Sequence, residues 1–171
     1  FHPGEGLVYI PVIEAAFPYF PETNWQADAN RGFNVGIDQA AGAIDARLGG
    51  AIREFTQRRM FRAQLGQVFV LPCPPGALRA GFVLFAGLGD FDVYGGRAGA
   101  FVAENVVRTL ARSGIDDFAT VLLGGGSGLR VAAALEPQLR GVLDGLRHAD
   151  PGRVLRRVTL CEIDARRFAA L

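Results

Sequence analysis

Two apolar runs that end in glycine-rich turns constrain the fold of this chain more than any other feature. The runs 81–86 and 118–123 each predict a fully buried strand, and glycines follow both of them directly. An amphipathic helix is expected after each turn, over about 97–113 and from 131 onward. Alternating strands and helices of this kind predict an α/β fold, with a mostly parallel sheet covered by helices on both faces.

The flanking segments add further elements to this pattern. The run 6–13 is rich in β-formers, but Pro11 predicts an edge strand or an irregular one. Apolar residues spaced three to four apart predict a helix over 43–62, in which Gly49-Gly50 indicates either a break or the close approach of another backbone. The other expected elements are strands at 67–71 and 154–163 and a short terminal helix at 164–171.

The positions of large apolar residues predict which face of each long helix is buried. Gly114 is expected to end the first long helix, and Pro137 is expected near the first turn of the second or at a kink. The predicted buried side chains are Phe101, Val102, Val106 and Leu110 in the first helix, and Val131, Leu135, Leu139, Val142, Leu143 and Leu146 in the second.

The segment 16–38 is rich in aromatic residues and has no clear period, which predicts a long loop. We weigh two interpretations equally: a lid over a ligand, or a cover over the edge of the core. Trp25, Tyr19 or Phe20 could stack on a base in the first case, although packing is the commoner role for each aromatic residue alone.

Composition excludes several classes of function. All 18 basic residues are arginine, so Walker-type phosphate loops, Schiff-base enzymes and Ser-Lys dyads lack their lysine. Two histidines and two cysteines give little material for a metal site or a His-based triad, and Cys73 and Cys161 are expected to be free, buried thiols. The formal net charge of +1 argues against nucleic acid as a partner. Neither a membrane span nor a signal peptide is evident, so a cytoplasmic protein is expected.

The two glycine-rich turns are the candidate binding elements. The run Gly124–Gly128 could let the backbone approach a phosphate, with Ser127 as a hydroxyl donor and Arg130 as a positive charge. A flexible turn that only admits tight packing is the alternative, because a glycine run is weakly specific. At the turn Gly87–Asp90, a side chain such as Asp90 or Asp92 could accept a hydrogen bond from a ligand, although capping the next helix is the commoner role.

Several of these segments resemble a known family. The runs 80–90 and 121–128, with the helix between them, resemble the non-catalytic N-terminal domain of leucyl aminopeptidases, which has a macro-domain-like fold. The segments 42–50 and 158–171 are similar to a diverged bacterial branch of that domain, and the resemblance covers 42–171 in all. It implies a three-layer fold without peptidase activity, because the catalytic residues of the family belong to a separate domain.

The diverged branch resembles modules joined to caspase-like (CHAT-type) proteases in bacterial antiviral defence. We therefore expect residues 1–171 to form a single domain excised from a larger polypeptide. Macro-like domains take ADP-ribose, so the resemblance implies a regulatory sensor of an ADP-ribose-type nucleotide made by a TIR-type enzyme. Whether that signal is cyclic is left open, as is a homo-oligomer.

The resemblance places the diphosphate on the second glycine run and makes the first turn the neighbouring wall. The expected ligand-binding residues are Trp25, Gly87, Leu88, Gly89, Asp90, Tyr94, Arg97, Gly124, Gly125, Gly126, Ser127, Gly128 and Arg130, with no catalytic residue, metal or cofactor. The expected partner is a caspase-like protease domain in the same polypeptide. The alternatives are a protein-interaction module without a pocket and, least favoured, a hydrolase of ADP-ribose conjugates that uses Asp90 or Asp92.

Overall fold

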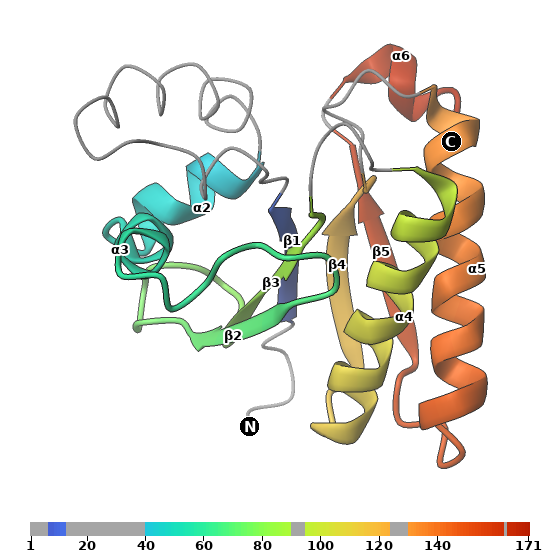
Figure 1. The fold of residues 1–171 in the computed structure, drawn as a ribbon, viewed down its shortest axis with the longest axis horizontal. Coiled ribbons are helices and arrows are strands. Elements are labelled where there is room, and N and C mark those ends of the chain that lie inside the picture. The colour runs from blue at the N-terminus through green and yellow to red at the C-terminus, as the bar shows by residue number, and fades with distance from the viewer. Residues whose placement is uncertain (1–6, 13–39, 90–94, 124–129, 163) are drawn as a thin grey trace.

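The computed structural model describes residues 7–12, 40–89, 95–123, 130–162 and 164–171 of the chain. Within these residues, strands form one sheet in the order β2-β3-β1-β4-β5 (Figure 1). The strands are β1 (Leu7–Val12), β2 (Val68–Pro72), β3 (Phe82–Gly87), β4 (Asp117–Val121) and β5 (Arg157–Cys161). The helices are α2 (Ala40–Arg47), α3 (Ala51–Gln57), α4 (Gly96–Arg112), α5 (Val131–Ala149) and α6 (Ala165–Phe168).

The sheet is mostly parallel, as expected. Strand β1 pairs in parallel with β3 and with β4, β4 pairs in parallel with β5, and only β2 runs antiparallel to its neighbour β3. Strands β1, β3, β4 and β5 therefore end at one edge of the sheet, which we call the carboxyl edge. In Figure 1 this edge lies at the top, where α4 and α5 also begin.

Strand β1 lies in the middle of the sheet, so the expectation of an edge or irregular strand was wrong. The reason lies in the register. Pairing with β4 is confined to Leu7 and Val8, whereas pairing with β3 runs along the whole strand and includes Pro11. Proline cannot donate a backbone hydrogen bond, and here it lies beyond the part of the strand that is paired on both sides.

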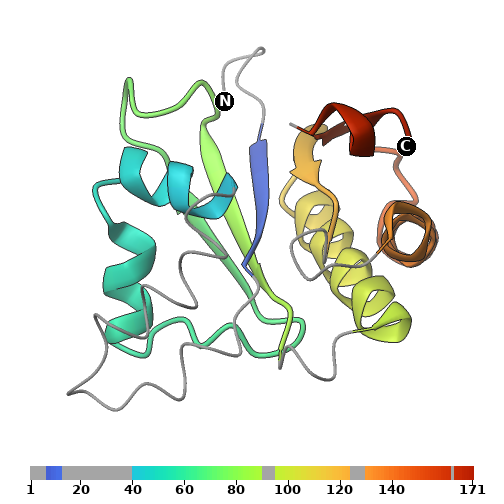
Figure 2. The same ribbon diagram turned by 90° about the horizontal axis from the view of Figure 1, so that it is seen from above.

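Helices cover both faces of the sheet, which confirms the predicted three-layer α/β architecture. Side chains of β3 alternate between the two faces. Val83 and Phe85 pack with Ile52 on the side of α3, and Leu84 and Ala86 pack on the side of α4. Figure 2 shows α2 and α3 on one side of these strands and α4 and α5 on the other.

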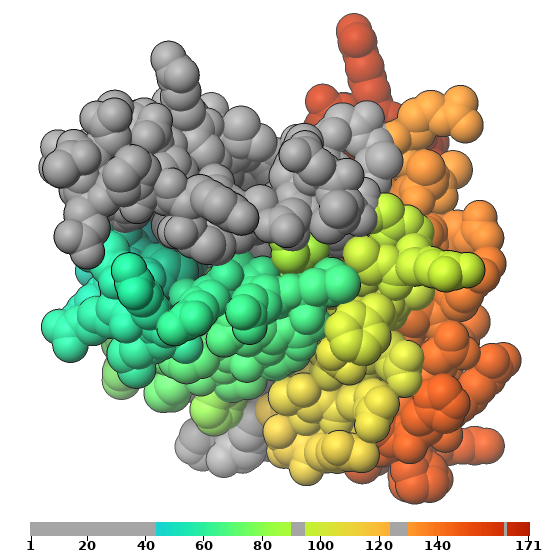
Figure 3. Space-filling view, in the orientation of Figure 1, coloured from blue at the N-terminus to red at the C-terminus, as the bar shows by residue number. Residues whose placement is uncertain are grey.

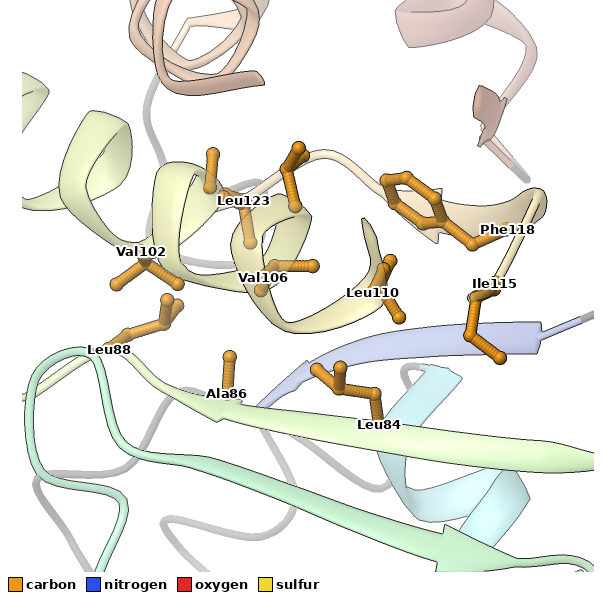
Figure 4. Packing of buried hydrophobic residues seen from close by; sticks show 11 residues of the cluster. Leu84, Ala86, Leu88, Val102, Val106, Leu110, Ile115, Phe118 and Leu123 are labelled. Carbon is orange, nitrogen blue, oxygen red and sulfur yellow. The ribbon is translucent and has the colours of Figure 1, made fainter. Parts of the chain in front are cut away.

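The larger core lies between β3 and α4. Val102, Val106 and Leu110 are at most 1% exposed and face the sheet, as Figure 4 shows and as the helical spacing predicts. Phe101 was also expected on this face, but its side chain is 46% exposed. It points away from the core and packs over Gly66.

Helix α5 buries the face that its large apolar residues predict only in part. Val142 and Leu146 pack against the core as expected, and Val131 and Leu135 are half-buried. Ala134, Gly141 and Gly145 are buried, whereas Leu139 and Leu143 are each 52% exposed. Small residues face α4 because its backbone comes too close for larger ones. A Cβ atom on Gly145 would lie 2.7 Å from the Cβ atom of Val107. Helix α5 therefore packs on a second helix, and Leu139 and Leu143 project away from that contact.

The segment 43–62 forms two short helices in place of the single helix that its spacing predicts. Gly49 and Gly50 lie between them with φ angles of 68° and 82°, a left-handed conformation that suits glycine. Open space surrounds both glycines, so they provide a break and not a close approach. The buried carboxylate of Asp45 secures the junction by accepting a hydrogen bond of 2.9 Å from the Ile52 N–H.

Three further expectations can be compared with the described residues. Both cysteines are free thiols, but Cys73 is half-buried and Cys161 is exposed, so burial was wrong for Cys161. Pro137 lies inside α5 and not in its first turn. None of the helices in the described ranges has both the length and the apolar character needed to cross a bilayer.

Candidate functional site

Two strands that lead toward the glycine-rich runs of the sequence end at the carboxyl edge. Strand β3 leads into Leu88 and Gly89 there, and β4 leads into Leu122 and Leu123, which are 4% and 1% exposed. The first turn of α4 lies beside α5, because a Cβ atom on Gly96 would be 3.5 Å from Cγ of Pro137. Both helices therefore begin at this edge, and the N-terminus of α4 lies beside the second turn of α5.

Both helices begin without a side-chain cap. The N-cap residue is Gly95 in α4 and Arg130 in α5, and neither first turn contains an acidic residue. Helix α6 begins at the same edge but has a capped N-terminus. Its N-cap residue Asp164 accepts hydrogen bonds of 2.9 Å from the backbone N–H groups of Arg166 and Arg167. Among the residues that the structure describes, the two long helices thus present uncapped, electropositive ends.

Two arginines reinforce the positive charge of these helix ends. Arg97 occupies the first turn of α4 and Arg130 is the N-cap of α5, and both are exposed. Within the described ranges, neither forms an ion pair with a carboxylate. A cation at a helix N-terminus is unfavourable in itself, so this arrangement suits an anion that both the helix dipoles and the guanidinium groups can bind.

The turn at Gly87 is needed for packing inside the protein. Its carbonyl oxygen accepts a hydrogen bond of 2.9 Å from the Gly66 N–H, and the Gly89 N–H donates one of 3.1 Å to Ala63. A Cβ atom on Gly87 would overlap the carbonyl oxygen of Gln64. Leu88 is 1% exposed and belongs to the core. The chain at 63–67 thus passes directly over this turn and lies against α4 in Figure 3.

This close approach places the three expected ligand residues Gly87, Leu88 and Gly89 in an internal contact. The glycine backbone groups named above bind the chain at 63–66, and the Leu88 side chain faces α4. The assignment of these residues to a ligand wall stays a prediction. Two glycines around a leucine are a sequence pattern that permits another backbone segment to come close to this turn. The sequence does not identify which segment does so.

Sequence reasoning missed Gln138, which lies in α5 and is 5% exposed. Its Oε1 accepts a hydrogen bond of 2.9 Å from the Leu123 N–H, and its Nε2 donates one of 3.2 Å to the Val121 carbonyl oxygen. The side-chain amide therefore binds the end of β4 as a further strand residue would. Only the correct choice of the buried face of α5 could have revealed it, because Gln138 lies on that face between Ala134 and Gly141.

Two other arginines are paired with carboxylates. Arg157 stands at the start of β5, at the opposite end from the carboxyl edge, where its guanidinium donates a hydrogen bond to Asp117. This bond and the negative charge of Asp117 raise the pKa of Arg157 above its usual value. Arg167 at α6 forms an ion pair of 3.1 Å with Glu162. Neither arginine has the free guanidinium of a phosphate ligand.

Several predicted site residues lie outside the described residues, and their roles stay predictions. They are Trp25, Asp90, Tyr94, Gly124, Gly125, Gly126, Ser127 and Gly128. Asp92, an alternative cap, also lies there, and the N-cap position of α4 belongs to Gly95. In the described part of the chain, no three His, Cys, Asp or Glu side chains gather in a way that could hold a metal ion.

Comparison with solved structures identifies the fold. The chain superposes on a mutant of tomato leucine aminopeptidase with a TM-score of 0.63 and 15% identity over 94% of its length. It superposes on an Oceanobacillus iheyensis macrodomain solved with ADP-ribose with a TM-score of 0.62 and 15% identity, covering 95% of this chain and 80% of that one. The bottromycin maturation enzyme BotP gives 0.56 and 20% over 96% of this chain.

The share of the neighbour's own length that this chain covers differs between the two enzymes and the macrodomain. The chain spans 30% of the tomato enzyme and 29% of BotP, but most of the macrodomain. The TM-scores show a shared macrodomain-like fold, and at 15–20% identity the likeness concerns the fold alone. No curated protein sequence matches the chain. The sequence profile of the cytosol aminopeptidase family, N-terminal domain, matches residues 36–143, well over half of the chain. The chain therefore belongs to the family of cytosol aminopeptidase N-terminal domains.

Proposed function

We propose that this domain binds an ADP-ribose-type nucleotide at the carboxyl edge of its sheet. The diphosphate would lie on the run Gly124–Gly128, against the N-terminus of α5 and the guanidinium of Arg130. The observation that carries the proposal is that two helix N-termini without a side-chain cap begin at this one edge, each with an exposed arginine. The macrodomain-like fold supports it, because neighbours of this fold were solved with ADP-ribose and with ADP.

Elementary electrostatics explains why these helix ends favour a diphosphate. A negative charge at a helix N-terminus gains about 0.3–1 kcal/mol, and a charge-assisted hydrogen bond adds about 1.5–3 kcal/mol. Arg97 and Arg130 can each supply such a bond, and the first backbone N–H groups of α4 and α5 supply further donors. A diphosphate carries enough oxygen acceptors to bind several of these groups together.

The wider role of the domain is also a proposal. We propose that it is a non-catalytic sensor whose nucleotide controls a caspase-like effector in the same polypeptide, in the cytoplasm. A nucleotide can drive such a switch only through its different affinities for the two states of the protein.

Calorimetric titration with ADP-ribose tests the binding proposal. Arg130→Ala should weaken binding about tenfold or more, as expected for the loss of a charge-assisted bond worth about 1.5–3 kcal/mol. Arg147→Ala is the matched control, because Arg147 is an exposed arginine in the last turn of the same helix. Equal affinities for the two variants would remove Arg130 from the site.

A protein-interaction module is the second candidate, and the exposed side of α5 favours it. Leu139 and Leu143 are each about half exposed and lie one turn apart on the same helix, a typical arrangement for a docking face. This module would have no nucleotide affinity, and changing either leucine to serine would abolish capture of a partner without affecting the fold. If both leucine variants still bind ADP-ribose, the result supports the nucleotide-binding domain and contradicts the interaction module.

A further inference from the structure

The geometry points to Gln138 as a positioning residue that sets the end of β4 for nucleotide binding and couples it to α5. This inference rests on the proposed function, because it concerns the same carboxyl edge. Gln138 itself would not touch the nucleotide. It would hold the backbone of Val121–Leu123 in place, and this backbone leads directly into the glycine run.

The two hydrogen bonds of Gln138 have complementary directions, and this makes the contact specific. One side-chain amide accepts from the Leu123 N–H and donates to the Val121 carbonyl oxygen. An apolar side chain of similar size could fill the same space but would leave both backbone groups without these partners. Leu123 is 1% exposed, so water can hardly replace the lost partner.

The contact also joins the candidate site to a rigid pair of helices. One turn after Gln138, Gly141 lies against Ala100 in α4, and Gly145 lies against Val107 and the carbonyl oxygen of Glu104. Close packing between backbones resists sliding, because any shift of α5 along α4 produces overlap. Helix α5 therefore gives Gln138 a fixed support, from which it holds the end of β4 against displacement.

Two substitutions separate positioning from mere packing. Gln138→Met keeps the approximate volume and removes both hydrogen bonds, so the affinity for ADP-ribose should fall about tenfold. Gln138→Glu has nearly the same shape. Its protonated carboxyl can still accept from Leu123 and donate to Val121, whereas the ionised form has no proton to donate. Affinity of Gln138→Glu should approach that of the wild type at pH 5 and fall at pH 8.

The affinity of the wild type for ADP-ribose is measured at both pH values. Its change is subtracted, which removes the effect of every other group that ionises between pH 5 and pH 8. Leu110→Ala is the control for stability, because Leu110 is buried near the end of α4 that lies away from the carboxyl edge. It should destabilise the fold and leave the affinity for ADP-ribose unchanged. Gln138→Met with wild-type affinity, or with a loss no greater than that of Leu110→Ala, would overturn the inference.

A second measurement keeps this test separate from that of the proposed function. If the wild type fails to bind ADP-ribose, the proposed ligand is wrong, and amide hydrogen exchange without any ligand then decides the role of Gln138. Gln138→Met should speed exchange at the Leu123 N–H by tenfold or more relative to Leu110→Ala. Equal exchange in the two variants would show that Gln138 does not hold the end of β4.

Discussion

Gly141 of α5 faces the backbone carbonyl of Ala100 in α4 so closely that a Cβ atom at position 141 would overlap that oxygen. Ala100 of α4 contacts Gly141 of α5, and Val107, further along α4, contacts Gly145, further along α5. The two helices therefore run parallel. Both therefore begin at the carboxyl edge. The contact between Gly141 and Ala100 thus helps to place two positive helix ends at the same edge of the sheet.

Gly141→Ala tests this close packing. Alanine favours a helix over glycine by about 1 kcal/mol, but overpacking against a backbone oxygen that cannot rotate away costs about 1–3 kcal/mol or more. The steric term should win, and the midpoint of thermal unfolding should fall by several degrees. Gly152→Ala is the control, since its Cβ atom would meet only Val154 at 3.9 Å and should shift the midpoint little. A stabilised Gly141→Ala protein would contradict the packing described above.

The orientation of α5 is tested by comparing two leucines of opposite exposure. Leu110→Ala removes a side chain that is 1% exposed and should lower the free energy of unfolding by about 2–5 kcal/mol. Leu143→Ala removes one that is 52% exposed, so the loss should stay below about 1 kcal/mol. Urea titration measures both. A large loss for Leu143→Ala would mean that α5 buries Leu143, in contradiction of the orientation described above.

Cys73 provides a pH-dependent prediction. Partial burial raises the pKa of its thiol, because the thiolate is less well solvated there. The thiolate is the reactive form, so labelling of Cys73 in a Cys161→Ser protein should accelerate with pH around a midpoint above that of the same protein unfolded in urea. Disulfide exchange with a chromogenic reagent, followed across pH 7–10, gives both midpoints. Coincident midpoints would contradict the burial of this thiol.

Trp25 is the only tryptophan in the chain, so its fluorescence reports on the segment 16–38 alone. If this segment acts as a lid that stacks on the base, ADP-ribose should quench or shift the emission, and Trp25→Phe should largely retain binding while Trp25→Ala weakens it. Binding by calorimetry with no change in emission would assign the segment to another role.

The main elements of the fold could be predicted from the sequence because buried strands and glycine punctuation are local signals. The run 82–87 is apolar at nearly every position, and the structure buries it on both faces. The central position of β1 could not be predicted in this way. It depends on pairing with strands far away in the chain, and these pairings leave Pro11 outside the doubly paired part.

The candidate site was only partly predictable for a related physical reason. Glycine runs and Arg130 mark the carboxyl edge in the sequence itself, but the helix faces that meet there depend on distant partners. Apolar residues indicated the buried face of α5 only in part. Val142 and Leu146 pack against the core, but the closest contact with α4 is made by small residues such as Gly141 and Gly145. The incomplete prediction also concealed Gln138, whose importance follows only from its contact with Leu123.

The most direct test of nucleotide binding is the thermal stability of this domain with ADP-ribose, its cyclic isomers, NAD and cyclic dinucleotides in parallel. A ligand at 100 times its dissociation constant adds about 2.7 kcal/mol to the free energy of unfolding, which raises the midpoint of a domain of this size by several degrees. We expect such a rise with an ADP-ribose-type compound and none with the cyclic dinucleotides. An unchanged midpoint with every compound, at millimolar concentration, would contradict nucleotide binding at the carboxyl edge.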